Sequence, residues 1–497
     1  MKIYPAPHRL ANVLFFESRY FRLALAVVFL TMTFADASVD AKEGGNPQRP
    51  NVLFIAIDDL NDWVGFLNGN PNVQTPNMDR LAARSVVFTN AQCPAPACVP
   101  SRNAMFTSLH PTTTGMYTNG CGNFRKAEIT KEAVTLPQHF MQNGYRAEGV
   151  GKITHSTDTA SWHEFGKVTA EKHLPNHEGY WQHWGMLDVE KEEMVDWKRA
   201  QWTVGRIKKG LPEPFFLACG FHLPHVDWHA PKAYLEKFPV DEIELPPINL
   251  DDYDDIPGRE NSGELFKKRY LDTGKAKQAV QGYLGCIHFV DECVGQLVDA
   301  LDDSQFKDNT IIVLWSDHGM HVGEKLRYGK FALWEESAHA PLLFSAPSLG
   351  IEPGRCDEVA NLIDIYPTLI DLCGLPKRDG LDGISLMPQL QDPTTERASP
   401  SMTSNRQYQN TLRTKRWRYI RSQDGSDELY DHDHDPNEWR NLADNPEYAS
   451  VIKELSAFIP IEQAMDLANS PENVARREAS QKKQREKKQT VKKGKSK

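Results

Sequence analysis

The stretch NVLFIAIDD, residues 51–59, decides the fold class because an unbroken apolar run ends abruptly at two carboxylates. A continuous run of this length is typical of a central strand that is covered on both faces. Residues 310–316 repeat the pattern and end at an Asp-His pair. Shorter runs at 145–150 and 215–219 also lead into polar residues. We therefore expect four central strands whose ends carry polar groups.

Helical patterns lie between these runs, at residues 78–84, 134–143 and 279–301. Alternating strands and helices predict an α/β domain with helices on the faces of a sheet. In open sheets of this class, ligands bind just beyond the carboxyl ends of the strands. The polar residues after the four strands fall at that edge, so we expect one shared site there.

Two of these strand ends favour a metal ion. Adjacent carboxylates such as Asp58 and Asp59 repel and raise each other's pKa unless a cation neutralises them. Asp317 with His318 is a second acid-bearing end. Hard cations such as Ca²⁺ prefer several oxygen ligands. Asp-Asp pairs are also common in loops, so only their joint occurrence on central strands indicates a metal.

The segment CVPSR, residues 98–102, predicts a helix over residues 101–108 with Pro100 and Ser101 in its first turn. Cys98 then lies at a helix N-terminus, where backbone N–H groups favour anions, so a low-pKa thiol is one interpretation. A buried structural or disulfide cysteine is the other. Pairing cannot be deduced from spacing, which leaves Cys93 with Cys121, and Cys356 with Cys373, open.

Composition excludes several classes of protein. The chain has 497 residues, 40% apolar and 25% charged, which excludes wholesale disorder, collagen and a polytopic membrane protein. Its net charge of −10 is an average, because residues 475–497 carry +9 and residues 1–37 carry +2, which leaves −21 for the rest. A chain with so negative a central part repels nucleic acid, so we expect no nucleic-acid partner.

The N-terminus has the pattern of an export signal over residues 1–37. Basic residues precede an apolar run at 23–34, and Ala35-Asp36-Ala37 fits a small-x-small cleavage site. The run has twelve residues, whereas about 20 are needed to span a bilayer as a helix. We expect cleavage after Ala37, a periplasmic or secreted product and no stable membrane span. An uncleaved anchor or a buried core helix is the alternative.

The C-terminal third divides into two further parts. Residues 413–420 and 428–431 flank Asp424-Gly425, which predicts a hairpin within a small α+β domain at 395–465. Residues 475–497 are a Lys/Gln/Arg-rich tail that cannot bury a core and is expected to be disordered. Such a tail solubilises the protein or contacts an anionic polymer.

Several motifs together resemble the type I sulfatases of the alkaline-phosphatase superfamily. Residues 98–102 match the family's C-x-P-S-R signature, whose cysteine is oxidised to Cα-formylglycine. The other matching elements are Asp58-Asp59, Gly151-Lys152-x-x-His155, Gly220-Phe221-His222-x-Pro224-His225, Asp317-His318-Gly319 with Lys330, and a C-terminal signature over residues 429–443. The resemblance spans residues 48–460, and the iduronate-2-sulfatase-like branch is the most similar.

The resemblance implies a fold and a set of roles. The fold is a large, mixed, mostly parallel sheet flanked by helices at residues 48–375, followed by a small domain with an antiparallel sheet. Calcium would be bound by Asp58, Asp59, Cys98, Asp317 and His318. A formylglycine-generating enzyme would oxidise Cys98, whose hydrate attacks sulfur. Arg102 would hold that hydrate, Lys152 and Lys330 would clamp sulfate, His155 would act as a base and His225 would protonate the leaving alcohol.

These observations favour an exported sulfuric-ester hydrolase that removes sulfate from a sulfated sugar or glycosaminoglycan-like oligosaccharide during polysaccharide degradation. One alternative is a phosphonate or phosphodiester hydrolase of the same superfamily. The other is a catalytically silent protein that binds anionic glycans and keeps Cys98 as a thiol.

Overall fold

The computed structural model describes residues 49–169, 184–256, 262–471, 473–475 and 478–479. The predicted signal segment 1–37 lies outside these residues, as does nearly all of the predicted basic tail. Both therefore stay predictions.

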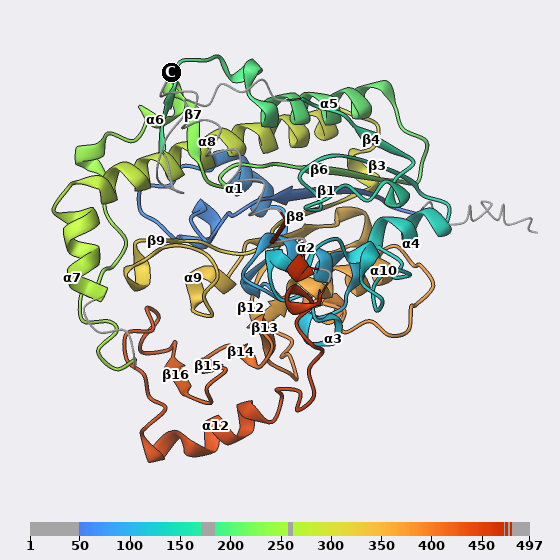
Figure 1. The fold of residues 1–497 in the computed structure, drawn as a ribbon. Helices are drawn as coiled ribbons and strands as arrows, with labels where there is room; N and C mark the ends of the chain where they lie inside the picture. The colour runs from blue at the N-terminus through green and yellow to red at the C-terminus, as the bar shows by residue number, and fades with distance from the viewer. Residues whose placement is uncertain (1–48, 170–183, 257–261, 472, 476–477, 480–497) are drawn as a thin grey trace, which may run out of the picture. The chain divides into compact units, whose positions relative to one another are not determined.

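An eight-stranded sheet carries the fold, in the order β12-β2-β11-β8-β1-β6-β3-β4 (Figure 1). Its central strand β1 pairs in parallel with both β6 and β8, and β11 is antiparallel to its neighbours β2 and β8. The expected mixed, mostly parallel sheet is therefore confirmed. The strands are β1 (Asn51–Ile57), β2 (Val86–Gln92), β3 (Arg146–Gly151), β4 (Glu164–Gly166), β6 (Phe215–Gly220), β8 (Thr310–Ser316), β11 (Leu342–Ser345) and β12 (Gly354–Asn361).

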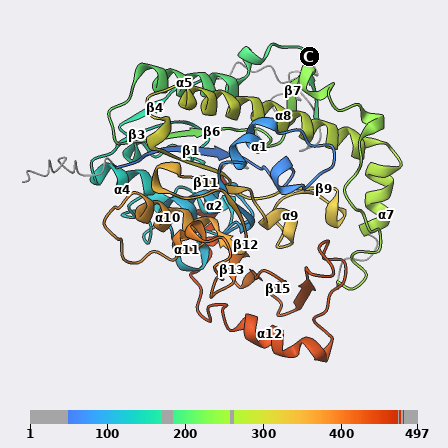
Figure 2. The same cartoon turned by 180° about the vertical axis from the view of Figure 1, so that it is seen from behind.

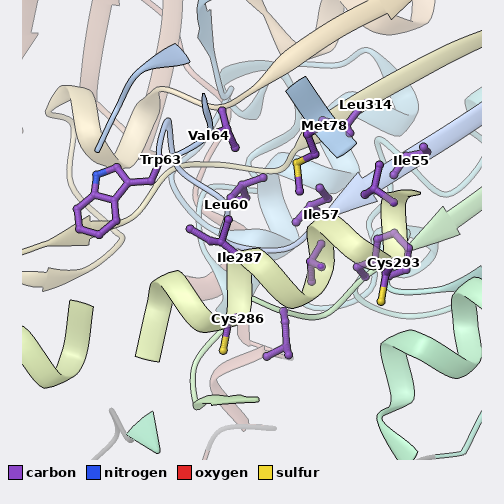
Figure 3. Close-up of a cluster of buried hydrophobic side chains, with 14 of the residues drawn as sticks. Ile55, Ile57, Leu60, Trp63, Val64, Met78, Cys286, Ile287, Cys293 and Leu314 are labelled. Atoms are coloured by element: carbon purple, nitrogen blue, oxygen red, sulfur yellow. The ribbon is translucent and has the colours of Figure 1, made fainter. Parts of the chain in front are cut away.

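Helices cover both faces of this sheet, as Figures 1 and 2 show from opposite sides. Side chains alternate along β1, so that Leu53, Ile55 and Ile57 enter one buried cluster and Val52 and Phe54 the other. Figure 3 shows part of the first cluster. It is covered by α1 (Pro76–Ala82), α5 (Val195–Lys209) and α8 (Lys275–Asp302), and the second cluster by α2 (Cys98–Thr107), α4 (Leu136–Gln142) and α10 (Ile365–Leu372).

A second, antiparallel sheet follows the first domain's core in the chain. Its four strands are β13 (Ser401–Arg406), β14 (Gln409–Arg413), β15 (Trp417–Arg421) and β16 (Asp427–Asp431), and α12 (Ala449–Ser456) packs on it. The predicted hairpin is confirmed as β15–β16, with Gly425 in the left-handed region at φ 89°. Arg413, expected in the same strand as Trp417, ends the preceding strand instead. The described residues belong to one compact unit, so the boundaries 48–375 and 395–465 stay predictions.

The remaining elements are short. They are α3 (Pro111–Thr114), β5 (Trp184–Leu187), β7 (Trp228–Pro231), α6 (Lys232–Leu235), α7 (Ser262–Phe266), β9 (His321–Val322), β10 (Tyr328–Gly329), α9 (Glu335–Ala338) and α11 (Met387–Gln391).

The eight cysteines are all buried, and neither of the disulfides left open by the sequence is formed. Across the part of the chain that is described, no helix combines the length and the apolar character needed to cross a membrane.

Candidate active site

The carboxyl ends of β1 and β8 bring the two acidic pairs together. The strands run in parallel with Ile57 opposite Ser316, so the residues after them emerge side by side. Asp59 adopts a left-handed φ of 63°, and its backbone N–H donates to Asp317 Oδ1 at 3.1 Å. Asp58, Asp59 and Asp317 have no exposed surface. The acidic residues expected at this edge of the sheet therefore lie together.

Arg102 lies beneath these carboxylates, fully buried on α2. Its guanidinium donates to Asp58 Oδ1 at 3.0 Å and to Asp317 Oδ2 at 2.8 Å. The remaining donors bind the carbonyls of Ile57, Lys152 and Ile153. Since these bonds use the whole guanidinium, Arg102 holds the acids rather than Cys98, which differs from the contact with the nucleophile that the resemblance implied.

Cys98 begins α2 and is buried among charged groups. Its Sγ lies 2.9 Å from Lys330 Nζ and 3.4 Å from His318 Nε2. Lys330 Nζ also donates to Asp59 Oδ1 at 2.6 Å. Burial and the nearby Asp58 carboxylate raise the pKa of the Cys98 thiol, although Lys330 opposes them. This environment favours the alternative of a buried cysteine over that of a low-pKa thiol.

His318 directs one ring nitrogen into the cluster. Its Nδ1 pairs with the Gly319 carbonyl at 2.9 Å, which leaves Nε2 facing Cys98, Asp59 and Asp317. Burial favours the neutral ring, but the Asp317 carboxylate raises the pKa of His318 to about 9. Its Nε2 thus faces the acids of the cluster, and its role as a metal ligand stays a prediction.

Lys152 and the segment after β6 form the more accessible side. Lys152 Nζ lies 3.3 Å from Asp58 Oδ2, and His222 Nδ1 lies 3.5 Å from the same atom. The rings of His222 and His225 stack with centroids 4.7 Å apart, and His225 Nε2 lies 3.9 Å from Asp59 Oδ2. His225 Nδ1 is paired with the Val226 carbonyl, so Nε2 is the nitrogen that faces the cluster.

His155 lies near enough to Lys152, Asp58 and His225 to interact with them electrostatically. Its side chain is exposed, and among the described residues no hydrogen bond or ion pair joins it to Cys98. It lines a cavity of about 230 Å³ with Val99 and Asn103 on α2. Partial burial and the Lys152 ammonium lower the pKa of His155 to about 4, so its ring is neutral near pH 7.

The donor set fits a hard divalent cation. Ligand atoms of Asp59, Cys98, Asp317 and His318 lie within 4.8 Å of one another, and so do those of Asp58, Asp59, Cys98 and His225. Asp58 Oδ2 and Asp59 Oδ2 are buried and accept no hydrogen bond from the described residues, although the Lys152 ammonium lies 3.3 Å from Asp58 Oδ2. Buried carboxylate oxygens without donors are costly unless a cation binds them.

The fixed charges of the cluster nearly balance. Three carboxylates (Asp58, Asp59 and Asp317) face the cations of Arg102, Lys152 and Lys330. His318, whose pKa Asp317 raises to about 9, adds one positive charge in its protonated form. A divalent cation in place of that proton would make the cluster more positive and so attract a sulfate or phosphate ester.

One residue that sequence reasoning missed is Asp196, in the first turn of α5. Its buried carboxylate accepts the backbone N–H groups of His222 and Leu223 at 2.8–3.0 Å, while Arg199 binds it at 2.6 Å. An acid in a first turn is read as a favourable helix charge, so no sequence signal distinguished it. Asp196 holds the segment that carries both histidines.

The fold is shared with solved hydrolases. A phosphonate monoester hydrolase of Agrobacterium radiobacter superposes with a TM-score of 0.69 at 20% identity, covering 82% of this chain and 94% of its own. A 2-O GAG sulfatase superposes with a TM-score of 0.67 at 22% identity, covering 82% and 91%. These likenesses show that the chain shares its fold with both proteins.

The sulfatase family model matches residues 50–375, and the N-sulphoglucosamine sulphohydrolase C-terminal model matches residues 323–464. The chain belongs to the sulfatase family and is a sulfuric ester hydrolase. It is 36% identical to a sulfatase of Formosa agariphila over 89% of this chain and 92% of that protein. It is 30% identical to iduronate 2-sulfatase of Homo sapiens over 65% and 69%, and 26% identical to an ulvan-active sulfatase of Formosa agariphila over 88% and 85%.

Proposed function

We propose that this protein is an exported sulfatase that removes sulfate from a sulfated sugar or glycosaminoglycan-like oligosaccharide. The observation that carries the proposal is the environment of Cys98. The chain is a member of the sulfatase family, and Cys98 Sγ lies 2.9 Å from the Lys330 ammonium. It also lies beside Asp58 and Asp59, each of which has one buried oxygen without a hydrogen bond from the described residues. This arrangement supports a nucleophile, an anion clamp and a cation-binding set at one strand edge.

Calcium would be held by Asp58, Asp59, Asp317 and residue 98, with His318 at the edge of the set. Cys98, once oxidised to formylglycine by a separate maturation enzyme, would supply the nucleophile, and bound calcium would supply positive charge beside it. A plain thiol cannot provide the second hydroxyl that releases sulfate.

The remaining roles follow from position. Lys330 and Lys152 approach the cluster from two sides and would bind sulfate oxygens as negative charge develops in the transition state. His225 has Nδ1 fixed by a carbonyl, so its Nε2 would give a proton to the leaving alcohol. His155, neutral and exposed, would act as the base in the second step. Arg102 would position the acids.

The substrate class is supported by relatives whose names specify a carbohydrate. They include iduronate 2-sulfatase, an ulvan-active sulfatase and a 2-O GAG sulfatase. The signal-like residues 1–37 support export to a periplasm or beyond, where such polymers are degraded.

The experiment is sulfate release from a panel of defined sulfated oligosaccharides, with Cys98→Ala as the control variant. Release by the wild type and none by Cys98→Ala is the expected outcome. The alternative of a phosphonate or phosphodiester hydrolase is tested by comparing the rates of hydrolysis of 4-nitrophenyl sulfate and bis-4-nitrophenyl phosphate. Faster cleavage of the phosphodiester would contradict the sulfatase proposal.

Peptide mass spectrometry over residue 98 tests the silent glycan-binding alternative. The formylglycine form is lighter than cysteine by about 18 Da. Consistent absence of that species in protein from the native host would favour the silent protein.

A further inference from the structure

Phe331, the residue after Lys330, is a large apolar side chain that remains 42% exposed. Its backbone has a φ of 68°, in the left-handed region that bulky residues rarely adopt. Backbone strain of this kind clusters at functional sites. An exposed phenyl ring also forgoes the gain from burial. The strained backbone and the exposed ring of Phe331 are therefore both unfavourable for the stability of the fold.

The backbone of Phe331 is fixed on both sides. Its N–H donates to the Pro96 carbonyl at 3.1 Å, and its own carbonyl accepts from Asn405 Nδ2 at 3.1 Å. Pro96 lies two residues before Cys98, and Asn405 lies on β13 of the small sheet. The ring is therefore held at a defined place rather than on a free loop.

The left-handed backbone brings the ring to the same side as the catalytic cluster. In an extended chain, successive side chains point to opposite faces. Here Lys330 Nζ lies 2.9 Å from Cys98 Sγ and also 6.0 Å from the centre of the Phe331 ring. The ring is thus within reach of a group attached to a sulfate at the cluster.

We propose that Phe331 is a specificity-determining residue. The sugar ring of the substrate lies on the exposed phenyl ring, while the sulfate group of the substrate lies beside Cys98 and Lys330. The inference rests on the proposed function and adds the shape and charge of the alcohol part. Aromatic rings offer a broad apolar surface that suits the C–H face of a pyranose. The adjacent Lys330 ammonium repels a cationic alcohol, so the site selects neutral or anionic sugars over choline-type esters.

Three variants separate a binding role from a structural one. Phe331→Gly removes the ring and relieves the left-handed strain, Phe331→Ala removes the ring alone, and Phe331→Tyr keeps an aromatic face. Leu265→Ala, at an exposed leucine of α7, is the matched surface control. The measurements are KM and kcat on a sulfated oligosaccharide, the inhibition constant of inorganic sulfate, the melting temperature and the oligomeric state.

We expect Phe331→Gly and Phe331→Ala to raise KM at least tenfold, with unchanged inhibition by inorganic sulfate, which has no ring to stack. Phe331→Tyr should restore KM, and Phe331→Gly should melt at or above the wild-type temperature. Wild-type KM in both ring-less variants, an equal loss of inorganic sulfate binding, or a change in oligomeric state alone would overturn the inference. If the wild type releases no sulfate from any saccharide, the proposed function itself fails.

Discussion

The Asp196 carboxylate accepts the backbone N–H of His222 with both of its oxygens, each at 3.0 Å. It also accepts the N–H of Leu223, so one buried acid on α5 fixes the start of the segment that ends at His225. Neither histidine depends on Asp196 for its own side-chain contacts. Asp196 is therefore a positioning residue for the accessible side of the site.

Asp196→Asn should lower kcat/KM by about 100-fold, because a displacement of about 1 Å in a catalytic group costs that much. Steady-state kinetics on a sulfated oligosaccharide measure it. Asp299→Asn, at an exposed ion pair with Arg80, is the control and should leave the rate unchanged. Equal kinetics in the two variants would show that the segment holds its place without Asp196.

Calcium should stabilise the folded chain by binding Asp58 Oδ2 and Asp59 Oδ2, the buried carboxylate oxygens without a hydrogen bond from the described residues. A ligand at 100 times its Kd adds about 2.7 kcal/mol to the free energy of unfolding, so the melting temperature should rise by a few degrees. Asp59→Asn should abolish this rise, whereas Asp299→Asn should retain it. A calcium-induced rise of the same size in Asp59→Asn would place the ion elsewhere.

Arg102→Lys should destabilise the protein by about 3 kcal/mol or more, because a lysine has fewer donors and leaves buried carboxylates unpaired. Urea unfolding measures this loss. Arg80→Lys, at the exposed pair with Asp299, should change stability by no more than about 0.5 kcal/mol. Similar losses in both variants would contradict the bonding of Arg102 described above.

His110 should make stability depend on pH without involving the site. Burial lowers the pKa of His110 to about 4, and its neutral ring bonds Thr112 and the Met402 carbonyl. Below the unfolded pKa of about 6.5 the unfolded chain binds the proton first, so stability falls as pH drops from 6.5 towards 4.

At pH 5 the loss from His110 should be about 2 kcal/mol. Melting temperatures between pH 7 and pH 5 measure it, and His110→Gln should show a shallower decline. An unchanged slope in that variant would assign the acid sensitivity to other groups.

The sequence predicts the two central strands to the residue, because residues 51–57 and 310–316 are continuous apolar runs that acids terminate. It also predicts that their ends meet, since parallel neighbours end at one edge. Three features escaped prediction because they depend on tertiary packing. Burial raises the pKa of the Cys98 thiol, whereas a helix N-terminus alone would lower it. Asp196 has the sequence pattern of an ordinary acid in a first helical turn. Arg413 ends β14 and does not lie in the strand that contains Trp417.

The bonds of Arg102 have a consequence for the order in which the protein assembles. This side chain connects the ends of β1, β3 and β8, and its bond to Asp317 joins residues 215 positions apart. Contacts this distant in sequence form only after long loops have closed. A chain that emerges with its N-terminus first therefore cannot complete the enclosure of the Asp58 and Asp59 carboxylates until Asp317 has followed them.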